Sequence, residues 1–190
     1  MEQTYYFIII GALIVEYLLS TISSVLNMNS ITATIPDGFQ EFYDDKKYSK
    51  SQEYLKDKTK LGLYSSTFSL ILTLIVIHFG LFGFLDEFVR SHSTHYIVSG
   101  LFFFGILFVI NDILNIPFSL YSTFVVEEKY GFNKTSIHTF VSDKCKGYGL
   151  TIVFGSALMV PIFYFFNTFQ DNGWWIAWAL MTAFMIAVQP

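Results

Sequence analysis

The residues best suited to chemistry in this sequence are a few polar side chains set inside long apolar stretches. Asn111, Asn115 and Ser119 follow one another at intervals of four, so a helix would place them on one face. Asp112 lies beside this stripe, and Glu16 interrupts an earlier apolar stretch. A carboxylate inside a membrane costs on the order of a few kcal/mol unless it meets water or a partner. Two interpretations stay open: hydrogen bonds that fix helix packing, or a polar stripe that faces water.

Metal chemistry would need histidines or acids at a ligand spacing. His92 and His95 lie three residues apart, but no acid stands between them to act as a base, and such pairs are more often polar loop residues. His78 falls in an apolar stretch, where a packed or cavity-facing role is more common. The single Cys145 excludes an intrachain disulfide and a multi-cysteine metal site. We therefore expect no cofactor and no catalytic or metal-binding residue within this chain.

Composition indicates the environment of these residues. The 190 residues are 53% hydrophobic and 19% aromatic, and only 14% are charged, against about 25% in an ordinary soluble domain. Twenty-two Phe and twelve Tyr are too many for one soluble core of this size. The net charge of −4 mixes acids and bases, which argues against nucleic acid as a partner. The sequence therefore predicts a protein whose main partner is the lipid bilayer.

Five stretches are apolar enough to cross a bilayer, which takes about 20 helical residues each. They cover residues 5–26, 62–85, 96–118, 148–169 and 173–189. The third should end near Pro117. The first is not a typical signal peptide, because only Glu2 precedes it where a basic segment would stand. We expect an all-α, polytopic integral membrane protein in which residues 1–190 form one membrane domain.

Basic residues give these helices a direction, because short loops rich in Lys and Arg stay in the cytoplasm. Ten of the eleven Lys and Arg residues fall in the loops 27–61 and 119–147, and the remaining one is Arg90. We expect an extracytoplasmic N-terminus and a cytoplasmic C-terminus, in a bacterial inner membrane or an endoplasmic reticulum membrane. The sequon that begins at Asn133 should then carry no glycan, since glycosylation occurs on the opposite face.

The first cytoplasmic loop contains a turn signal at residues 36–38, followed by aromatic residues on one helical face. It could form an interfacial helix that its tyrosines anchor at the headgroups. It could equally form a rigid lead-in that extends the second membrane helix into the cytoplasm. The sequence favours neither interpretation.

The second cytoplasmic loop contains the stretch VEEKYGFNKTSIHTFVSDKCK, residues 126–146. Gly131 allows a positive φ, and Asn133 can hydrogen-bond to its own backbone. Thr135 or Ser136 could cap a short helix towards residue 146. Physical chemistry predicts an ordered loop here and no catalyst.

One string in this loop resembles a known family. From Glu127 to Thr135 the sequence is E-E-K-Y-G-F-N-K-T, and Asp143 follows eight residues later. With the preceding tyrosines and prolines, this string resembles the N-terminal membrane region of type I CAAX prenyl proteases, which are integral-membrane zinc metallopeptidases. The resemblance extends over about residues 5–190. The motif residues that it marks are Glu127, Glu128, Gly131, Phe132, Asn133 and Asp143.

The resemblance carries expectations about function. The family binds Zn²⁺ through an H-E-x-x-H helix, which this sequence lacks. The chain alone should therefore be inactive, with zinc held in a downstream catalytic domain of the complete enzyme. The chain would form the wall of a membrane chamber for proteolysis of a peptide or prenylated-protein substrate. Candidate chamber-lining residues are Glu16, Asn111, Asp112, Asn115 and Ser119. The alternatives are a small transporter or channel subunit that uses the Asp112 stripe, and a catalytically inactive membrane anchor.

Overall fold

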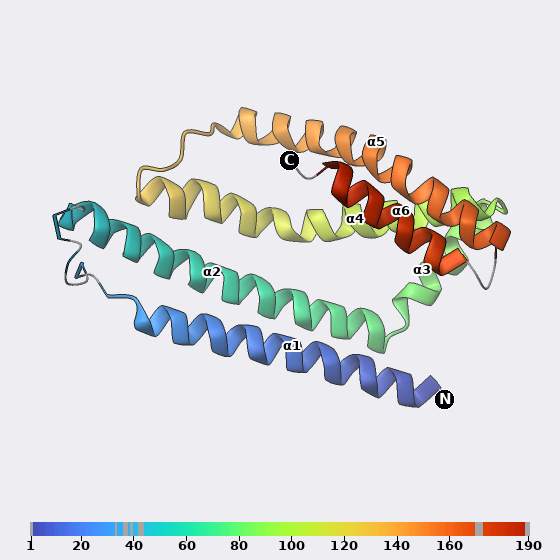
Figure 1. Ribbon diagram of the computed structural model, residues 1–190, viewed down its shortest axis with the longest axis horizontal. Helices are drawn as coiled ribbons and strands as arrows, with labels where there is room; N and C mark the ends of the chain where they lie inside the picture. Colours follow the sequence, from blue (N-terminus) through green and yellow to red (C-terminus); the bar gives the residue numbers. More distant parts are fainter. Residues whose placement is uncertain are drawn as a thin grey trace. The chain divides into compact units, whose positions relative to one another are not determined.

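The computed structural model confirms the expected all-α membrane fold (Figure 1). It describes residues 2–32, 34–35, 38, 40–41, 44–169 and 173–188. Over these residues the helices are α1 (Glu2–Ser30), α2 (Asp45–His78), α3 (Leu81–His92), α4 (Tyr96–Tyr121), the π-helical segment η1 (Ser122–Glu127), α5 (Ile137–Phe169) and α6 (Gly173–Val188). No strand occurs among them.

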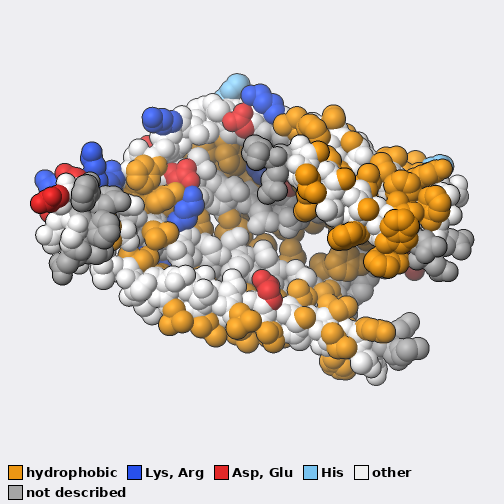
Figure 2. Space-filling model, viewed as in Figure 1, with side chains coloured by type: hydrophobic (Ala, Val, Ile, Leu, Met, Phe, Trp, Pro, Cys, Tyr) orange, Lys and Arg blue, Asp and Glu red, His pale blue; other side chains and the backbone are white. Residues whose placement is uncertain are grey.

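Four helical stretches are long and apolar enough to cross a membrane, namely α1, α2, α4 continued by η1, and α5. The shorter α6 has 16 residues and is also apolar. Large hydrophobic side chains lie on the surface of these helices (Figure 2). Leu19 on α1 and Ile152 on α5, for example, are 65% and 70% exposed. Exposed apolar surface of this extent is typical of contact with lipid. The protein is an integral membrane protein.

The second predicted span, 62–85, is divided in the structure. Helix α2 ends at His78, and Gly80 adopts a φ of 64°, a conformation that L side chains avoid and that commonly ends helices. The following residues form the separate helix α3. The sequence pattern missed this break because both sides of it are apolar.

At its other end, α2 is longer than the apolar stretch. It begins at Asp45 and continues without interruption to His78, so the structure supports the helical lead-in. Asp44 caps it, because its side-chain Oδ1 accepts a hydrogen bond from the Lys47 amide at 2.9 Å. The turn signal at residues 36–37 lies outside the described residues.

The third predicted span also differs at its end. Helix α4 continues through Pro117 to Tyr121 and then widens into η1. Proline removes one backbone donor and disturbs the turn before it, yet a helix in a membrane tolerates it when local π-type adjustments satisfy the freed groups. Most of the predicted loop 119–147 is therefore helical, since α5 starts at Ile137.

The structure divides into two compact units, residues 1–81 with 113–134, and residues 82–112 with 135–190. In the first unit α1 and α2 pack side by side and antiparallel (Figure 1). The Tyr17 hydroxyl lies 2.6 Å from Thr67 Oγ1, and the Tyr6 hydroxyl lies 3.3 Å from His78 Nδ1. The less exposed positions of α1 are 6, 10, 13, 17, 21, 24, 25 and 28, mostly three or four residues apart, which is the spacing of packed antiparallel helices.

The second unit contains α3, the first part of α4, α5 and α6. The Phe163 ring of α5 packs against Tyr96 and Phe104 of α4, with ring centroids 6.2 and 6.0 Å apart. Gly100 permits this approach, because a Cβ placed there would lie 2.7 Å from the Phe163 ring. Helices α5 and α6 also pack together.

Candidate functional site: the polar stripe of α4 and the cytoplasmic elbow

The motif string forms a tight elbow, residues 127–136, between η1 and α5. Gly131 has a φ of 67°, as its type and position predict. The amides of Phe132 and Asn133 both donate to the Glu127 carbonyl, at 2.9 and 3.3 Å, and the Gly131 amide donates to the Glu128 carbonyl at 2.9 Å. These bonds close the end of the helical segment in the manner of a glycine C-cap.

Asp57 of α2 holds this elbow. Its Oδ2 atom accepts hydrogen bonds from the Lys129 ammonium at 2.6 Å and from the Tyr130 hydroxyl at 2.8 Å. Tyr130 is only 4% exposed, so its hydroxyl depends on this acceptor. Asp57 lies before the apolar part of α2, and its bond to Lys129, then that to Tyr130, lowers the pKa of the Asp57 carboxyl. The same bond raises the pKa of Lys129.

Aromatic contacts from α2 also stabilise the elbow. The Tyr54 ring of α2 meets Tyr130 and Phe132 edge to face, with centroids 5.6 and 4.9 Å apart. Lys50 lies over the Phe132 ring at 5.8 Å. Phe132 nevertheless remains 50% exposed. Its free surface is therefore available to another part of a larger assembly.

The acidic motif residues have different neighbours. Glu127 forms an ion pair with Lys58 of α2 at 3.4 Å. Glu128 accepts a hydrogen bond from the Asn133 side chain at 2.9 Å, across the elbow. Asp143 lies on α5 and pairs locally with Lys146 at 3.2 Å. The motif thus combines contacts to α2 with bonds inside the elbow.

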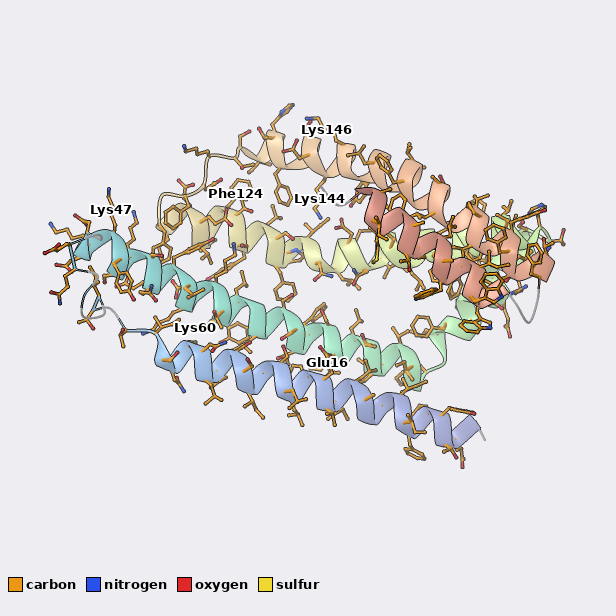
Figure 3. All side chains as sticks on the ribbon, viewed as in Figure 1. Glu16, Lys47, Lys60, Phe124, Lys144 and Lys146 are labelled. Atoms are coloured by element: carbon orange, nitrogen blue, oxygen red, sulfur yellow. The ribbon has the colours of Figure 1, made fainter. Side chains whose placement is uncertain are left out.

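Ser136 caps α5, as the sequence allowed, by accepting a hydrogen bond from the Thr139 amide at 3.1 Å. The helix that follows is not short, because it continues to Phe169. Lys144 and Lys146 lie in its first part (Figure 3).

The polar stripe of α4 separates into two environments. Asn115 and Ser119 line a groove of about 390 Å³ in the first unit. Its other lining residues are Lys58, Leu61, Gly62 and Ser65 of α2, and Phe118, Ser122 and Thr123. Hydroxyl, amide and ammonium groups line it together with apolar surface. Asn115 and Ser119 therefore have polar neighbours, which the interpretation of a water-facing stripe requires.

Asp112 lies in the second of these environments. Its carboxylate accepts hydrogen bonds from Lys144 and from the Tyr148 hydroxyl, both at 2.5 Å, and thereby ties α4 to α5 in the second unit. The side chains of Asp112 and Lys144 are only 20% and 27% exposed. Asn111 lies one turn before Asn115 on α4. A half-buried carboxylate with two partners fixes packing more than it offers a free charge.

Glu16 is the remaining candidate, and it lies exposed near the middle of α1 (Figure 3). No hydrogen-bond or ion-pair partner reaches its side chain from the described part of the chain. A lone carboxylate in lipid would be costly, so this position favours contact with water or with a further polar group.

Zinc does not fit the described residues. They contain no group of three or more His, Cys, Asp or Glu side chains placed to hold a metal ion. His78 is engaged by Tyr6, and His92 Nδ1 lies 2.8 Å from the Phe88 carbonyl of its own helix.

Three residues that hold the site were not foreseen. Asp57, Lys144 and Tyr148 are partners of motif or stripe residues from 32 to 73 positions away. A weak signal existed for Lys144, because a half-buried aspartate in an apolar helix calls for a cation nearby. Nothing in the local sequence around Asp57 distinguishes it from other acids in the same loop.

Comparisons with known proteins agree with this architecture. Residues 24–189 match the family model described as CAAX prenyl protease N-terminal, five membrane helices. A probable CAAX prenyl protease 1 of Schizosaccharomyces pombe is 35% identical over 163 residues, which are 78% of this chain and 34% of that protein. A CAAX prenyl protease 1 homolog of Arabidopsis thaliana is 27% identical over 187 residues, 91% of this chain and 43% of that protein.

The crystal structure of S. mikatae Ste24p shares the fold, with a TM-score of 0.84 and 24% identity, over 96% of this chain and 44% of that one. This chain thus spans between about a third and less than half of the length of these relatives. The match covers most of the sequence, including the elbow and the polar stripe. The chain therefore belongs to the CAAX prenyl protease N-terminal family.

Proposed function

We propose that this chain is the N-terminal membrane domain of a CAAX prenyl protease-like zinc metalloendopeptidase and forms part of the wall of its membrane chamber. The family match over residues 24–189 carries this proposal. The substrates would be prenylated or other membrane-associated peptides, because the relatives are named CAAX prenyl proteases. The partners of the chain would be the bilayer and the catalytic part of the enzyme.

A wall needs an apolar outer face and polar groups on another face. The hydrophobic surface of the long helices supports the first requirement. The groove that contains Asn115 and Ser119, and the exposed carboxylate of Glu16, support the second. In the complete enzyme, zinc would activate a water molecule for peptide hydrolysis. Residues of this chain would enclose and admit the substrate and supply no zinc ligand.

The proposed orientation places the N-terminus outside and the elbow in the cytoplasm. After Cys145→Ser, single cysteines at Lys56 and Lys134 should react with a membrane-impermeant maleimide only once cells are opened. A cysteine at Ser93, in the connection between α3 and α4, should react in intact cells or sealed lumen-out vesicles. If the reagent labelled position 134 from the extracytoplasmic side and left position 93 unlabelled, the proposed topology would be wrong.

A chimera tests the function. Residues 24–189 would replace the matched segment of the S. pombe relative, and the purified chimera would be incubated with a farnesylated peptide ending in a CAAX sequence. We expect cleavage that a zinc chelator abolishes. The matched control replaces the zinc-binding histidines of the relative's catalytic part with alanine in the same chimera.

The chimera must first be monodisperse and contain zinc, which separates misfolding from inactivity. A folded, zinc-loaded chimera that cleaves no prenylated peptide would contradict the proposal. Solute flux through vesicles containing this chain alone would favour the transporter alternative instead.

A further inference from the structure

The connection between α2 and α4 contains a structured element that the sequence had placed partly in a span and partly in a loop. Helix α3 runs for 12 residues, Leu81–His92, a length of about 18 Å. Only Phe79 and Gly80 separate it from α2, and only residues 93–95 separate it from α4.

These short tethers confine α3 to the membrane surface. Two or three extended residues reach at most about 7 to 11 Å, and both neighbouring helices cross the membrane. Successive spans reverse direction, so α2 ends and α4 begins at the same face of the bilayer. A helix held at both ends in this way lies along that face.

The side chains of α3 are sorted into two faces. At about 100° per residue, the apolar residues fall within an arc of about 160°, and the charged residues fall opposite. The apolar set is Leu81, Phe82, Phe84, Leu85, Phe88 and Val89. On the polar side Arg90 and Asp86 form an ion pair one turn apart, at 2.8 Å. This pattern is typical of a helix at an interface between water and an apolar phase.

Side chains of α3 are buried only towards one edge of the apolar arc. Val89 is 4% exposed and Leu85 is half-buried, so these two side chains are covered by the protein. At the other edge, Phe84 is 69% and Phe88 is 49% exposed. These two phenylalanines lie one turn apart and form an exposed apolar strip, and the ring described against it is His92 of the same helix, 4.7 Å from Phe88 between centroids.

A second feature places lipid headgroups at this level of the second unit. The Tyr96–Phe163 contact brings the start of α4 to the last part of α5, so α6 begins at the same face. Trp174 and Trp178, one turn apart at the start of α6, are both exposed. Exposed tryptophans at the end of a membrane helix are typical of the headgroup region.

We propose that α3 binds the bilayer surface as an interfacial helix, with Phe84 and Phe88 inserted among the lipid chains at the headgroup boundary. The helix carries Asp86 and Glu87 against Arg90, so its own charge does not attract anionic lipid. Apolar contact therefore drives its binding, and zwitterionic lipid is sufficient. This inference does not depend on the proteolytic function.

Nitroxide labels can test it on the full 190-residue chain in phosphatidylcholine nanodiscs. After Cys145→Ser, single labelled cysteines would replace Phe84 and Phe88, and Gly83 and Glu87 on the polar face would serve as matched controls. All four positions are exposed. We expect collisions with oxygen to dominate at 84 and 88, and collisions with an aqueous nickel chelate to dominate several-fold at 83 and 87.

Each contrary result has a distinct meaning. Nickel access at all four positions would show that the helix stands in water, and this would overturn the proposal. Exclusion of both reagents from 84 and 88 would show that protein, either a second copy or another segment, covers the strip, and would overturn it equally. Adding phosphatidylserine should leave the contrast unchanged, and a marked increase would refute apolar contact as the driving force.

Discussion

Asp57→Ala should loosen the cytoplasmic elbow by about 1–3 kcal/mol. The Asp57 carboxylate accepts hydrogen bonds from two donors, the Lys129 ammonium at 2.6 Å and the Tyr130 hydroxyl at 2.8 Å. Tyr130 is buried, so removal of the carboxylate leaves its hydroxyl without this acceptor, which costs about 1–3 kcal/mol. The Lys129 side chain is exposed, and water replaces its lost partner.

Hydrogen exchange at the elbow measures this loss directly, because local opening exposes the Phe132 and Asn133 amides that bond to Glu127. We expect Asp57→Ala to accelerate their exchange by about 5- to 150-fold. Asp57→Asn keeps an amide oxygen that can accept from the Tyr130 hydroxyl, and it should have a much smaller effect. Tyr130→Phe removes the donor but keeps the ring, which should cost about 0.5–1.5 kcal/mol.

The pH dependence follows from the two pKa directions. The folded pKa of Asp57 is lowered, so its contribution is present above the unfolded value of about 3.9 and is lost as the pH falls through the folded value. The folded pKa of Lys129 is raised, so its contribution is present below about 10.4 and is lost only as the pH rises further. The effect of Asp57→Ala should therefore be constant between about pH 5 and 10. Equal acceleration by Asp57→Ala, Asp57→Asn and Lys129→Ala, or none by any of them, would refute the reasoning.

Two glycine substitutions test the packing argument with matched controls. Gly131→Ala should destabilise the chain by about 1–2 kcal/mol, because its φ of 67° disfavours any Cβ, whereas Gly147→Ala in the open surface of α5 should not destabilise it. Gly100→Ala should cost about 1–3 kcal/mol in detergent unfolding, because the new Cβ would lie 2.7 Å from the Phe163 ring. Gly105→Ala, which meets no atom within 4 Å, should be neutral, and a similar loss at Gly105 would contradict the packing.

Much of the fold could be predicted because lipid simplifies the pattern. A membrane helix must be apolar on all sides for about 20 residues, and lysines mark one side, so the spans and the class of fold follow from composition. The ends of the helices were harder to predict, because each end depends on single residues. The break at Gly80 and the continuation through Pro117 were not predicted, because glycine and proline each permit more than one backbone path in a membrane helix.

The candidate site was predictable only in part. The motif string and Gly131 could be recognised locally, since a string of neighbours carries its own turn chemistry. The partners of these residues could not, because Asp57 meets Tyr130 across 73 positions and Asp112 meets Tyr148 across 36. Such pairs depend on which helix faces which, and apolar spans give no periodic signal of that.

The length of the unbroken α2 helix determines how far the elbow lies from the hydrocarbon layer. Its apolar part, from Leu61 to His78, is about 27 Å long and matches the thickness of the hydrocarbon layer. The preceding 16 residues, from Asp45 to Lys60, add about 24 Å beyond it. Asp57 lies about 6 Å along this extension, so the elbow that it holds is at the depth of the lipid phosphates. A peptide whose lipid tail remains in the bilayer would meet the elbow without leaving that layer, while a soluble peptide would have to descend past the tip of α2.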